Sequence, residues 1–102
     1  EDFLKVDLVA GGVRAQGEVD VANADRLLVA LVEAVEATTS GLVEVDLAGI
    51  EFMGSAGLQA LLAADRRAKD IGVHLRVVRP SNAVRTVVLL TRIDEVLDIS
   101  EG

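Results

Sequence analysis

Two different hydrophobic spacings alternate along the whole 102-residue chain. Short apolar or alternating runs, typical of strands, are followed by longer stretches whose apolar residues recur every three or four positions, typical of helices. The order is strand, strand, helix, strand, helix, strand, helix, strand. This order is the pattern of an α/β domain with right-handed crossovers. We therefore predict one domain over residues 1–102, with a single-layer, mixed but mostly parallel sheet of about five strands covered by three or more helices.

The predicted strands are short and are separated by glycine, proline or small polar residues. They are FLKVDLV, VRAQGEV, LVEVDL, VHLRVV and VLDIS. The first two flank the turn Ala10–Gly12, so we expect them to pair as a hairpin. The third, which ends at Leu47, is apolar enough for an interior strand.

Three helices are predicted between these strands. The first is indicated by apolar residues at helical spacing: Val21, Ala24, Leu27, Leu28, Leu31 and Val35. The second runs from Ser55 to about Asp70. The third is NAVRTVVLLT, which follows Pro80 and has Ser81 as its predicted cap.

Composition and charge exclude several classes of function. The formal net charge of −7 argues against a broad surface for nucleic acid or for anionic membranes. With no cysteine and only His74 as a histidine, we expect no disulfide, no metal site and no cofactor. No run approaches the roughly 18 apolar residues of a membrane span, and the acidic start EDFLKVDL is unlike a secretory signal. A cytoplasmic protein is therefore expected.

The predicted second helix has one bulky face and one face of small residues. On a helical wheel Leu58, Leu61 and Leu62 share one sector, which is predicted to face the sheet. The opposite sector holds Ala56, Gln59, Ala60, Ala63 and Arg67. Helix propensity alone can explain the alanines. The explanation we favour is a flat outer face that another protein can approach closely.

Ser55 stands at the start of this helix, between Gly54 and Ala56. As an N-cap, its hydroxyl would stabilise the helix by about 1 kcal/mol. As a phosphoserine, it would add roughly −1.5 to −2 charges at the positive end of the helix dipole, which the fold should tolerate. The small neighbours leave the hydroxyl accessible to another enzyme, so the residues alone leave both readings open.

Two enzymatic readings of the sequence are weak. Gly49 and Gly54 have the spacing of a nucleotide-binding loop, but Ser55 stands where that loop has lysine. Asp20 and Asp46 could in principle form an acid/base pair, yet no nucleophile, metal or substrate pocket accompanies them. We therefore expect a protein that is not an enzyme.

The central stretch VEVDLAGIEFMGSAGLQALL resembles the signature of the STAS domain family, the bacterial anti-sigma factor antagonists. The matching positions are Asp46, Leu47, Phe52, Met53, Ser55, Gly57 and Leu58. GEVD at Gly17–Asp20 resembles the family's Gly-Glu-Leu-Asp, and LLTRIDEVLDI resembles its closing segment. There the family usually has threonine-glycine-leucine rather than Thr91-Arg92-Ile93, and Gly54 stands where aspartate is usual.

The resemblance implies a non-enzymatic anti-sigma factor antagonist that acts by partner switching. Ser55 would be phosphorylated by an anti-sigma factor with serine kinase activity, which ends their binding, and a metal-dependent protein phosphatase would restore it. The expected partner contacts are Asp20, Gly54, Ala56, Gln59, Ala60 and Ala63. The alternative is a STAS scaffold or transporter-associated subunit that is never phosphorylated. A third class, a small-ligand-binding domain, has no phosphate-binding loop to support it.

Overall fold

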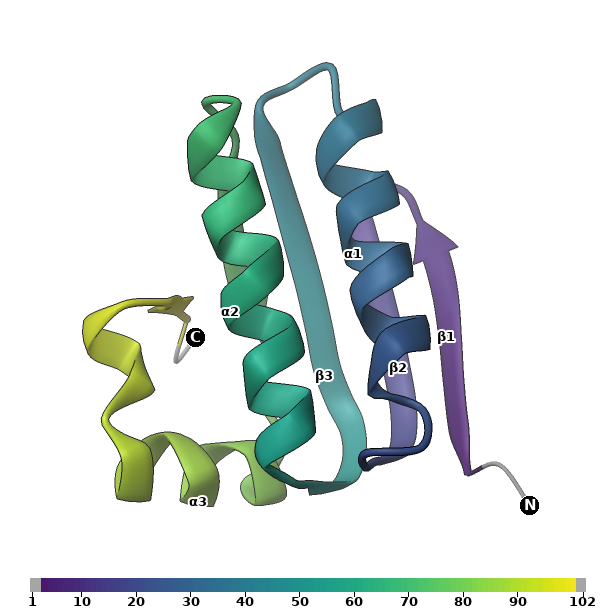
Figure 1. Ribbon diagram of the computed structural model, residues 1–102, viewed down its shortest axis with the longest axis vertical. Helices are drawn as coiled ribbons and strands as arrows, with labels where there is room; N and C mark the ends of the chain where they lie inside the picture. The colour runs from purple at the N-terminus through teal and green to yellow at the C-terminus, as the bar shows by residue number, and fades with distance from the viewer. Residues whose placement is uncertain (1–2, 101–102) are drawn as a thin grey trace.

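The computed structural model describes residues 3–100, which form one five-stranded sheet in the order β1-β2-β3-β4-β5. Helices α1 and α2 lie side by side across one face, and α3 lies near the end of the sheet where α2 begins (Figure 1). The elements are β1 (Leu4–Val9), β2 (Gly12–Val19), α1 (Ala24–Ala37), β3 (Leu42–Met53), α2 (Ser55–Asp70), β4 (His74–Val78), α3 (Asn82–Thr91), the 3-10 helix η1 (Ile93–Glu95) and β5 (Asp98–Ile99). The predicted fold class is confirmed.

The predicted hairpin is confirmed, because β1 and β2 pair antiparallel, whereas the remaining strands pair parallel. Leu4 lies opposite Gly17, whose φ of +101° few other residues adopt. A Cβ atom on Gly17 would stand 1.8 Å from the carbonyl oxygen of Phe3. That oxygen accepts a hydrogen bond of 3.0 Å from the N–H of Glu18. The backbone of Gly17 therefore lies so close to the carbonyl oxygen of Phe3 that only glycine fits at this position.

Strand β3 is longer than the sequence predicted. It does not end at Leu47 but continues to Met53, and its pairing with β2 shifts twice, between Arg14 and Gln16 and between Gly17 and Glu18. Such irregularities insert extra residues into a strand and interrupt its alternation. Beyond Leu47 the buried residues are therefore three apart, at Ile50 and Met53, which a period of two does not reveal.

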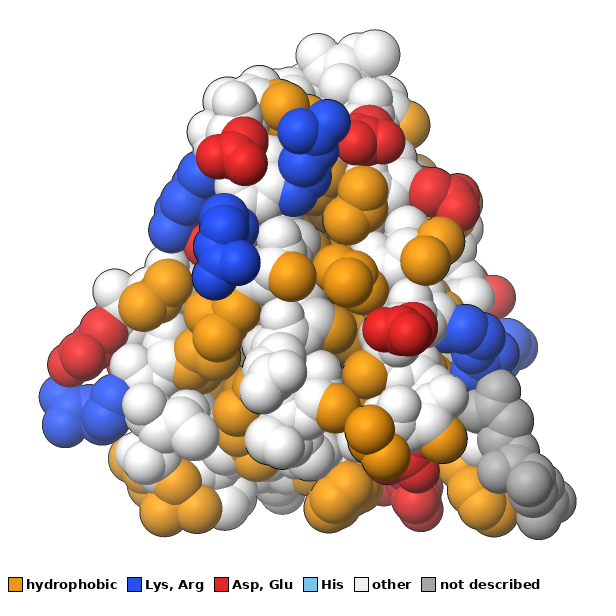
Figure 2. Space-filling model, in the orientation of Figure 1, with side chains coloured by type: hydrophobic (Ala, Val, Ile, Leu, Met, Phe, Trp, Pro, Cys, Tyr) orange, Lys and Arg blue, Asp and Glu red, His pale blue; other side chains and the backbone are white. Residues whose placement is uncertain are grey.

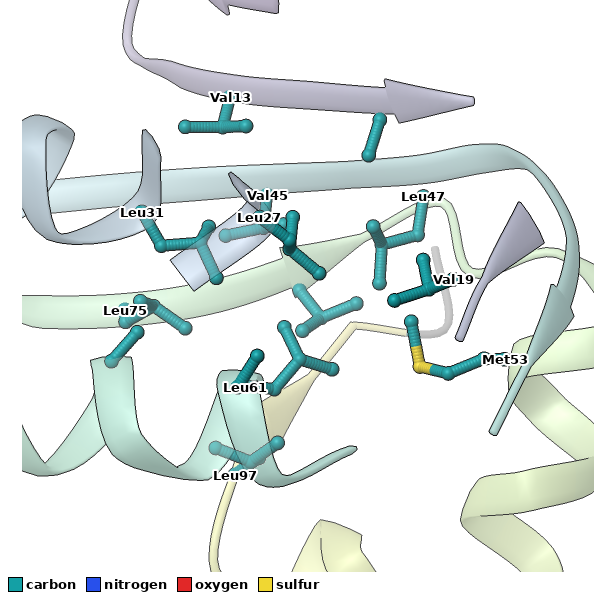
Figure 3. Packing of buried hydrophobic residues seen from close by; sticks show 14 of the residues in the cluster. Val13, Val19, Leu27, Leu31, Val45, Leu47, Met53, Leu61, Leu75 and Leu97 are labelled. Carbon is teal, nitrogen blue, oxygen red and sulfur yellow. The ribbon is translucent and has the colours of Figure 1, made fainter. Parts of the chain in front are cut away.

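The core is aliphatic and lies between the sheet and the two long helices. Figure 3 shows leucines of α1 and α2, including Leu27, Leu31 and Leu61, among side chains of the strands, including Val45 and Leu75. All five are at most 1% exposed. Each such side chain contributes roughly 1.5–3 kcal/mol when fully buried.

The inner face of α2 is not the one that the leucine spacing predicted. Leu61 is buried as expected, but Leu58 and Leu62 are only half-buried. Small residues take the innermost positions: Gly57, Ala60, Ala64 and Ala68. The prediction that Ala60 faces outward is wrong, since its side chain is 4% exposed. Small side chains let the helix approach its neighbours closely, and the leucines then pack at its flank.

The ends of the other helices agree with the sequence in part. Val21 was expected on the first helix but lies in the loop before α1, with 87% of its surface exposed. Ser81 caps α3 as predicted, because its hydroxyl accepts a hydrogen bond of 3.2 Å from the N–H of Val84. Within residues 3–100, no helix has the length and hydrophobicity needed to span a membrane.

Candidate functional site

The site lies where β2 and β3 end at the same edge of the sheet. Val19 and Met53, the last residues of these strands, are partners in the register. The N–H of Gly54 donates a hydrogen bond of 3.0 Å to the carbonyl oxygen of Val19. The structure therefore places Asp20, which follows β2, at the same edge as Ser55, which follows β3.

Ser55 is the first residue of α2 and not its N-cap. The N-cap is Gly54, which has no side chain to cap with, and the capping role predicted as one reading for Ser55 is therefore wrong. Its side chain is exposed, and its hydroxyl has no hydrogen-bond partner among residues 3–100. The oxygen is therefore available to another molecule without breaking a bond within this chain.

The two glycines beside Ser55 differ in what they permit. A Cβ atom on Gly57 would approach Met53 and Val19 to 2.9 Å, so this position keeps the first turn of α2 close to the strand ends. A Cβ atom on Gly54 would meet the ring of Phe52 at 3.5 Å, which is an ordinary contact. Packing thus requires glycine at Gly57, whereas a Cβ atom is accommodated at Gly54, where the resembling pattern usually has aspartate.

Asp20 starts a turn directly after β2. Its Oδ1 accepts a hydrogen bond of 3.0 Å from the N–H of Ala22. Its own N–H donates to Oδ1 of Asn23 at 2.9 Å, and Asn23 in turn donates to the carbonyl oxygen of Glu18 at 3.0 Å. These hydrogen bonds form the turn between β2 and α1. The carboxylate of Asp20 remains exposed.

Asp46 does not pair with Asp20. It lies within β3, opposite Arg14, and its carboxylate contacts Arg79 at 2.7 Å and Arg14 at 3.7 Å. Burial pushes the pKa of Asp46 upward, but the 3.0 Å hydrogen bond from the N–H of Ala48 and the two arginines outweigh burial and hold the pKa below its ordinary value. Asp46 therefore joins β2, β3 and the chain after β4, and the acid/base pair considered above does not exist.

Two carboxylates on the strands are expected to make the stability of the protein depend on pH. The hydrogen bond from His74, at 2.6 Å, and then that from Arg76, at 3.1 Å, lower the pKa of Asp98, as the pKa of Asp46 is lowered. A folded-state pKa below the unfolded value stabilises the protein above the unfolded pKa, and this contribution is lost as the pH falls through the folded pKa. We expect the free energy of unfolding, measured with urea, to decrease below about pH 4. Asp98→Asn and Asp46→Asn should each flatten that decrease, and unchanged slopes in both variants would contradict the assignment.

Two apolar residues at this edge were not assigned to the site from the sequence. Val21 follows Asp20 and is 87% exposed, and Phe52 precedes Met53 and is 50% exposed. Aromatic and aliphatic side chains exposed beside a functional group are frequent anchors of protein interfaces. Periodicity assigned Val21 to a helix, and only its place in a loop reveals its exposure.

The predicted contact residues on α2 divide between two surfaces. Ser55 and Gln59 line an open groove of about 440 Å³ that α2 forms with the segment Thr91–Val96. Ala56, Gln59, Ala60 and Ala63 line a second groove, between α1 and α2. Within residues 3–100, no three acidic or histidine side chains form a group that could hold a metal ion. The arrangement offers surfaces for binding.

Comparisons with known proteins agree with this architecture. The family model described as "Mlab, STAS domain" matches residues 4–98. An anti-sigma factor antagonist from Mycobacterium paratuberculosis is similar in structure, with a TM-score of 0.78 and 27% identity, over 97% of this chain and 85% of that chain. A putative anti-sigma factor antagonist from Thermotoga maritima has a TM-score of 0.75 and 18% identity, over 97% and 86%. The antagonist SpoIIAA in its unphosphorylated form has a TM-score of 0.72 and 17% identity, over 97% and 89%.

Proposed function

The chain belongs to the STAS domain family, and on that premise we propose that it is an anti-sigma factor antagonist acting by phosphorylation-dependent partner switching. Ser55 is the phosphoacceptor. The unphosphorylated protein binds an anti-sigma factor with serine kinase activity and so releases a sigma factor in the cytoplasm. Phosphorylation ends this binding, and a metal-dependent protein phosphatase restores it. The protein itself binds and does not catalyse.

The observation that carries this proposal is the state of the Ser55 hydroxyl. It is exposed, it lies in the first turn of α2, and it makes no hydrogen bond within residues 3–100. A kinase can therefore reach it, and the phosphate would lie near N–H groups that lack intrahelical acceptors. Neither the helix nor the core has to rearrange.

A phosphate at Ser55 would change the surface and not the fold. The edge already carries the exposed carboxylate of Asp20, and the protein has a formal net charge of −7. Nearby, Val21 and Phe52 expose apolar surface suited to a dry contact. A doubly charged group placed in such a contact has to lose its hydration, and this weakens association.

A second candidate function is supported by Gly54. The usual aspartate of the family pattern is absent there, although a Cβ atom at this position would make only ordinary contacts. A STAS domain that serves as a constitutive scaffold or transport-associated subunit needs no kinase recognition at this position. In that case Ser55 is never modified, and the same edge serves as a permanent interface.

Phosphorylation can be tested by intact-mass measurement with ATP and the anti-sigma kinase encoded in the same genome. We expect the mass to increase by one phosphate group, and Ser55→Ala to abolish the increase. Ser40→Ala is the control, because Ser40 is also an exposed serine but lies in the loop between α1 and β3, where its hydroxyl bonds to Leu42, and it should leave the increase intact. An unmodified protein, or a phosphate that persists in Ser55→Ala, would refute the proposed phosphoacceptor and favour the scaffold.

A further inference from the structure

An open groove of about 630 Å³ runs between α1 and α2. Its walls are Ala24 and Leu28 of α1 and Ala56, Ala60 and Ala63 of α2. Figure 2 shows hydrophobic side chains gathered along the seam between these helices. Most of these side chains are small, and Ala24 and Ala60 are buried at the bottom of the groove.

Two opposite charges border this groove, and both lack ion-pair partners. Asp25, in the first turn of α1, and Arg66, on α2, line the groove with exposed side chains. Neither forms an ion pair in the part of the chain that the structure describes. In contrast, two basic residues of α2 near Arg66 do form ion pairs. Arg67 contacts Glu36 at 2.9 Å, and Lys69 contacts Asp65 at 2.8 Å.

The two charges lie at opposite ends of the groove. Both helices follow parallel strands, so α1 and α2 run the same way, and Asp25 lies near their shared amino end. Arg66 is eleven positions after Ser55, about three turns farther along α2. The groove is therefore acidic at one end, apolar along its floor and basic at the other end.

We propose that this groove binds an α-helix of a partner protein. The helix would carry an apolar stripe for the alanine-lined floor, a basic side chain opposite Asp25 and an acidic side chain opposite Arg66. An amphipathic helix in an apolar groove is a common mode of recognition, and charges at the rim of an interface fix its orientation. A second copy of this chain is a poorer occupant, since two facing grooves would leave both floors uncovered.

This inference deepens the proposed function, on which it rests for the identity of the partner. Ala56 and Gln59, which are expected to contact the anti-sigma factor, follow Ser55 on α2 and also line the groove. The helix therefore belongs to that partner, and its recognition along α2 is separate from the phosphate at Ser55.

The probe is a designed helical peptide with a leucine and alanine stripe, a lysine near one end and a glutamate near the other. A matched peptide carries lysine at both ends. Binding to the full chain is measured by NMR from the backbone amide shifts of Ala56, Ala63 and Leu28. We expect the lysine–glutamate peptide to bind about fivefold more tightly, the scale of one exposed ion pair.

Charge reversal supplies the decisive control. Arg66→Glu should reverse the preference between the two peptides. Arg67→Glu is the same change one residue away, outside the groove; it removes the contact with Glu36 of α1 but should leave the preference between the peptides unchanged. Both side chains are exposed, so thermal unfolding should confirm that both variants fold.

Several outcomes would overturn the proposal. They are equal affinity for the two peptides, amide shifts confined to another surface, no shifts at millimolar peptide, or a dimer in sedimentation equilibrium that Arg66→Glu dissociates. The last result would make a second copy the occupant. No step requires a phosphate on Ser55, so failure here leaves the phosphorylation result standing, and a failed kinase assay leaves the peptide result standing.

Discussion

Gly17→Ala is expected to lower the free energy of unfolding by roughly 3 kcal/mol or more, from added steric overlap and an unfavourable positive φ. The new methyl group would stand 1.8 Å from the carbonyl oxygen of Phe3, and the backbone φ is +101°. Backbone atoms cannot move aside as a flexible side chain can, so the β1–β2 hairpin has to shift. Urea unfolding followed by circular dichroism measures the change, and typical domains have only about 5–15 kcal/mol to lose.

Gly72→Ala separates the two causes of this loss. Gly72 has a φ of +76°, but a Cβ atom on it would meet nothing within 4 Å. Its substitution should therefore cost only about 1 kcal/mol, the conformational part of the effect. If Gly17→Ala and Gly72→Ala lowered the free energy of unfolding equally, the close approach of Phe3 to Gly17 would not contribute to the loss.

Ser55→Glu should weaken binding to the anti-sigma factor by about 100-fold or more, since a charge desolvated in an interface costs several kcal/mol and about 1.4 kcal/mol is tenfold in affinity. The same substitution should leave thermal stability unchanged or slightly raised, because an acidic residue in the first turn of α2 favours the helix dipole. Isothermal titration calorimetry with the unmodified partner gives the affinity. Ser55→Ala, which adds no charge, should bind like the parent protein.

Ser40→Glu is the control for the charge itself. Ser40 lies in the loop between α1 and β3, and this variant also makes the net charge more negative by one unit. If Ser40→Glu weakened binding as much as Ser55→Glu, the effect would come from overall repulsion and not from the site. If Ser55→Glu bound as tightly as the parent, partner switching through this residue would be wrong.

Most of the element order was predictable because it depends on local patterns. Alternation, helical spacing and turn residues act over a few positions, and they correctly gave α2 as Ser55–Asp70 and α3 as Asn82–Thr91. The mixed, mostly parallel sheet follows from that order. The cap of α3 at Ser81 was also predictable from the sequence, since a cap needs only a hydroxyl directly before the first turn.

The errors arose where distant segments determine the local structure. The second half of β3 is a strand because β2 pairs with it across two irregularities, which no pattern within Leu47–Met53 reveals. The orientation of α2 depends on how closely it approaches the sheet and α1, so Ala60 and Gly57 lie inside while Leu58 lies at the flank.

The candidate site was predicted in part for the same reasons. The position of Ser55 at a helix start follows from its neighbours, but its freedom from hydrogen bonds depends on Gly54 taking the N-cap position. The exposure of Val21 depends on its place in the loop before α1, and the separation of Asp46 from Asp20 depends on the pairing of β2 with β3. The phosphoacceptor role of Ser55 stays a prediction for the kinase assay.

The strand order has a consequence for how the chain reaches its native state. From β2 onward, each strand pairs with the strand that precedes it in the sequence, so that partner has already been synthesised when the strand is made. Domains generally fold as units, so the sheet is completed only after the last strand has been made. The order of the strands nevertheless lets the sheet extend from the β1–β2 hairpin toward β5 without inserting any strand between two others.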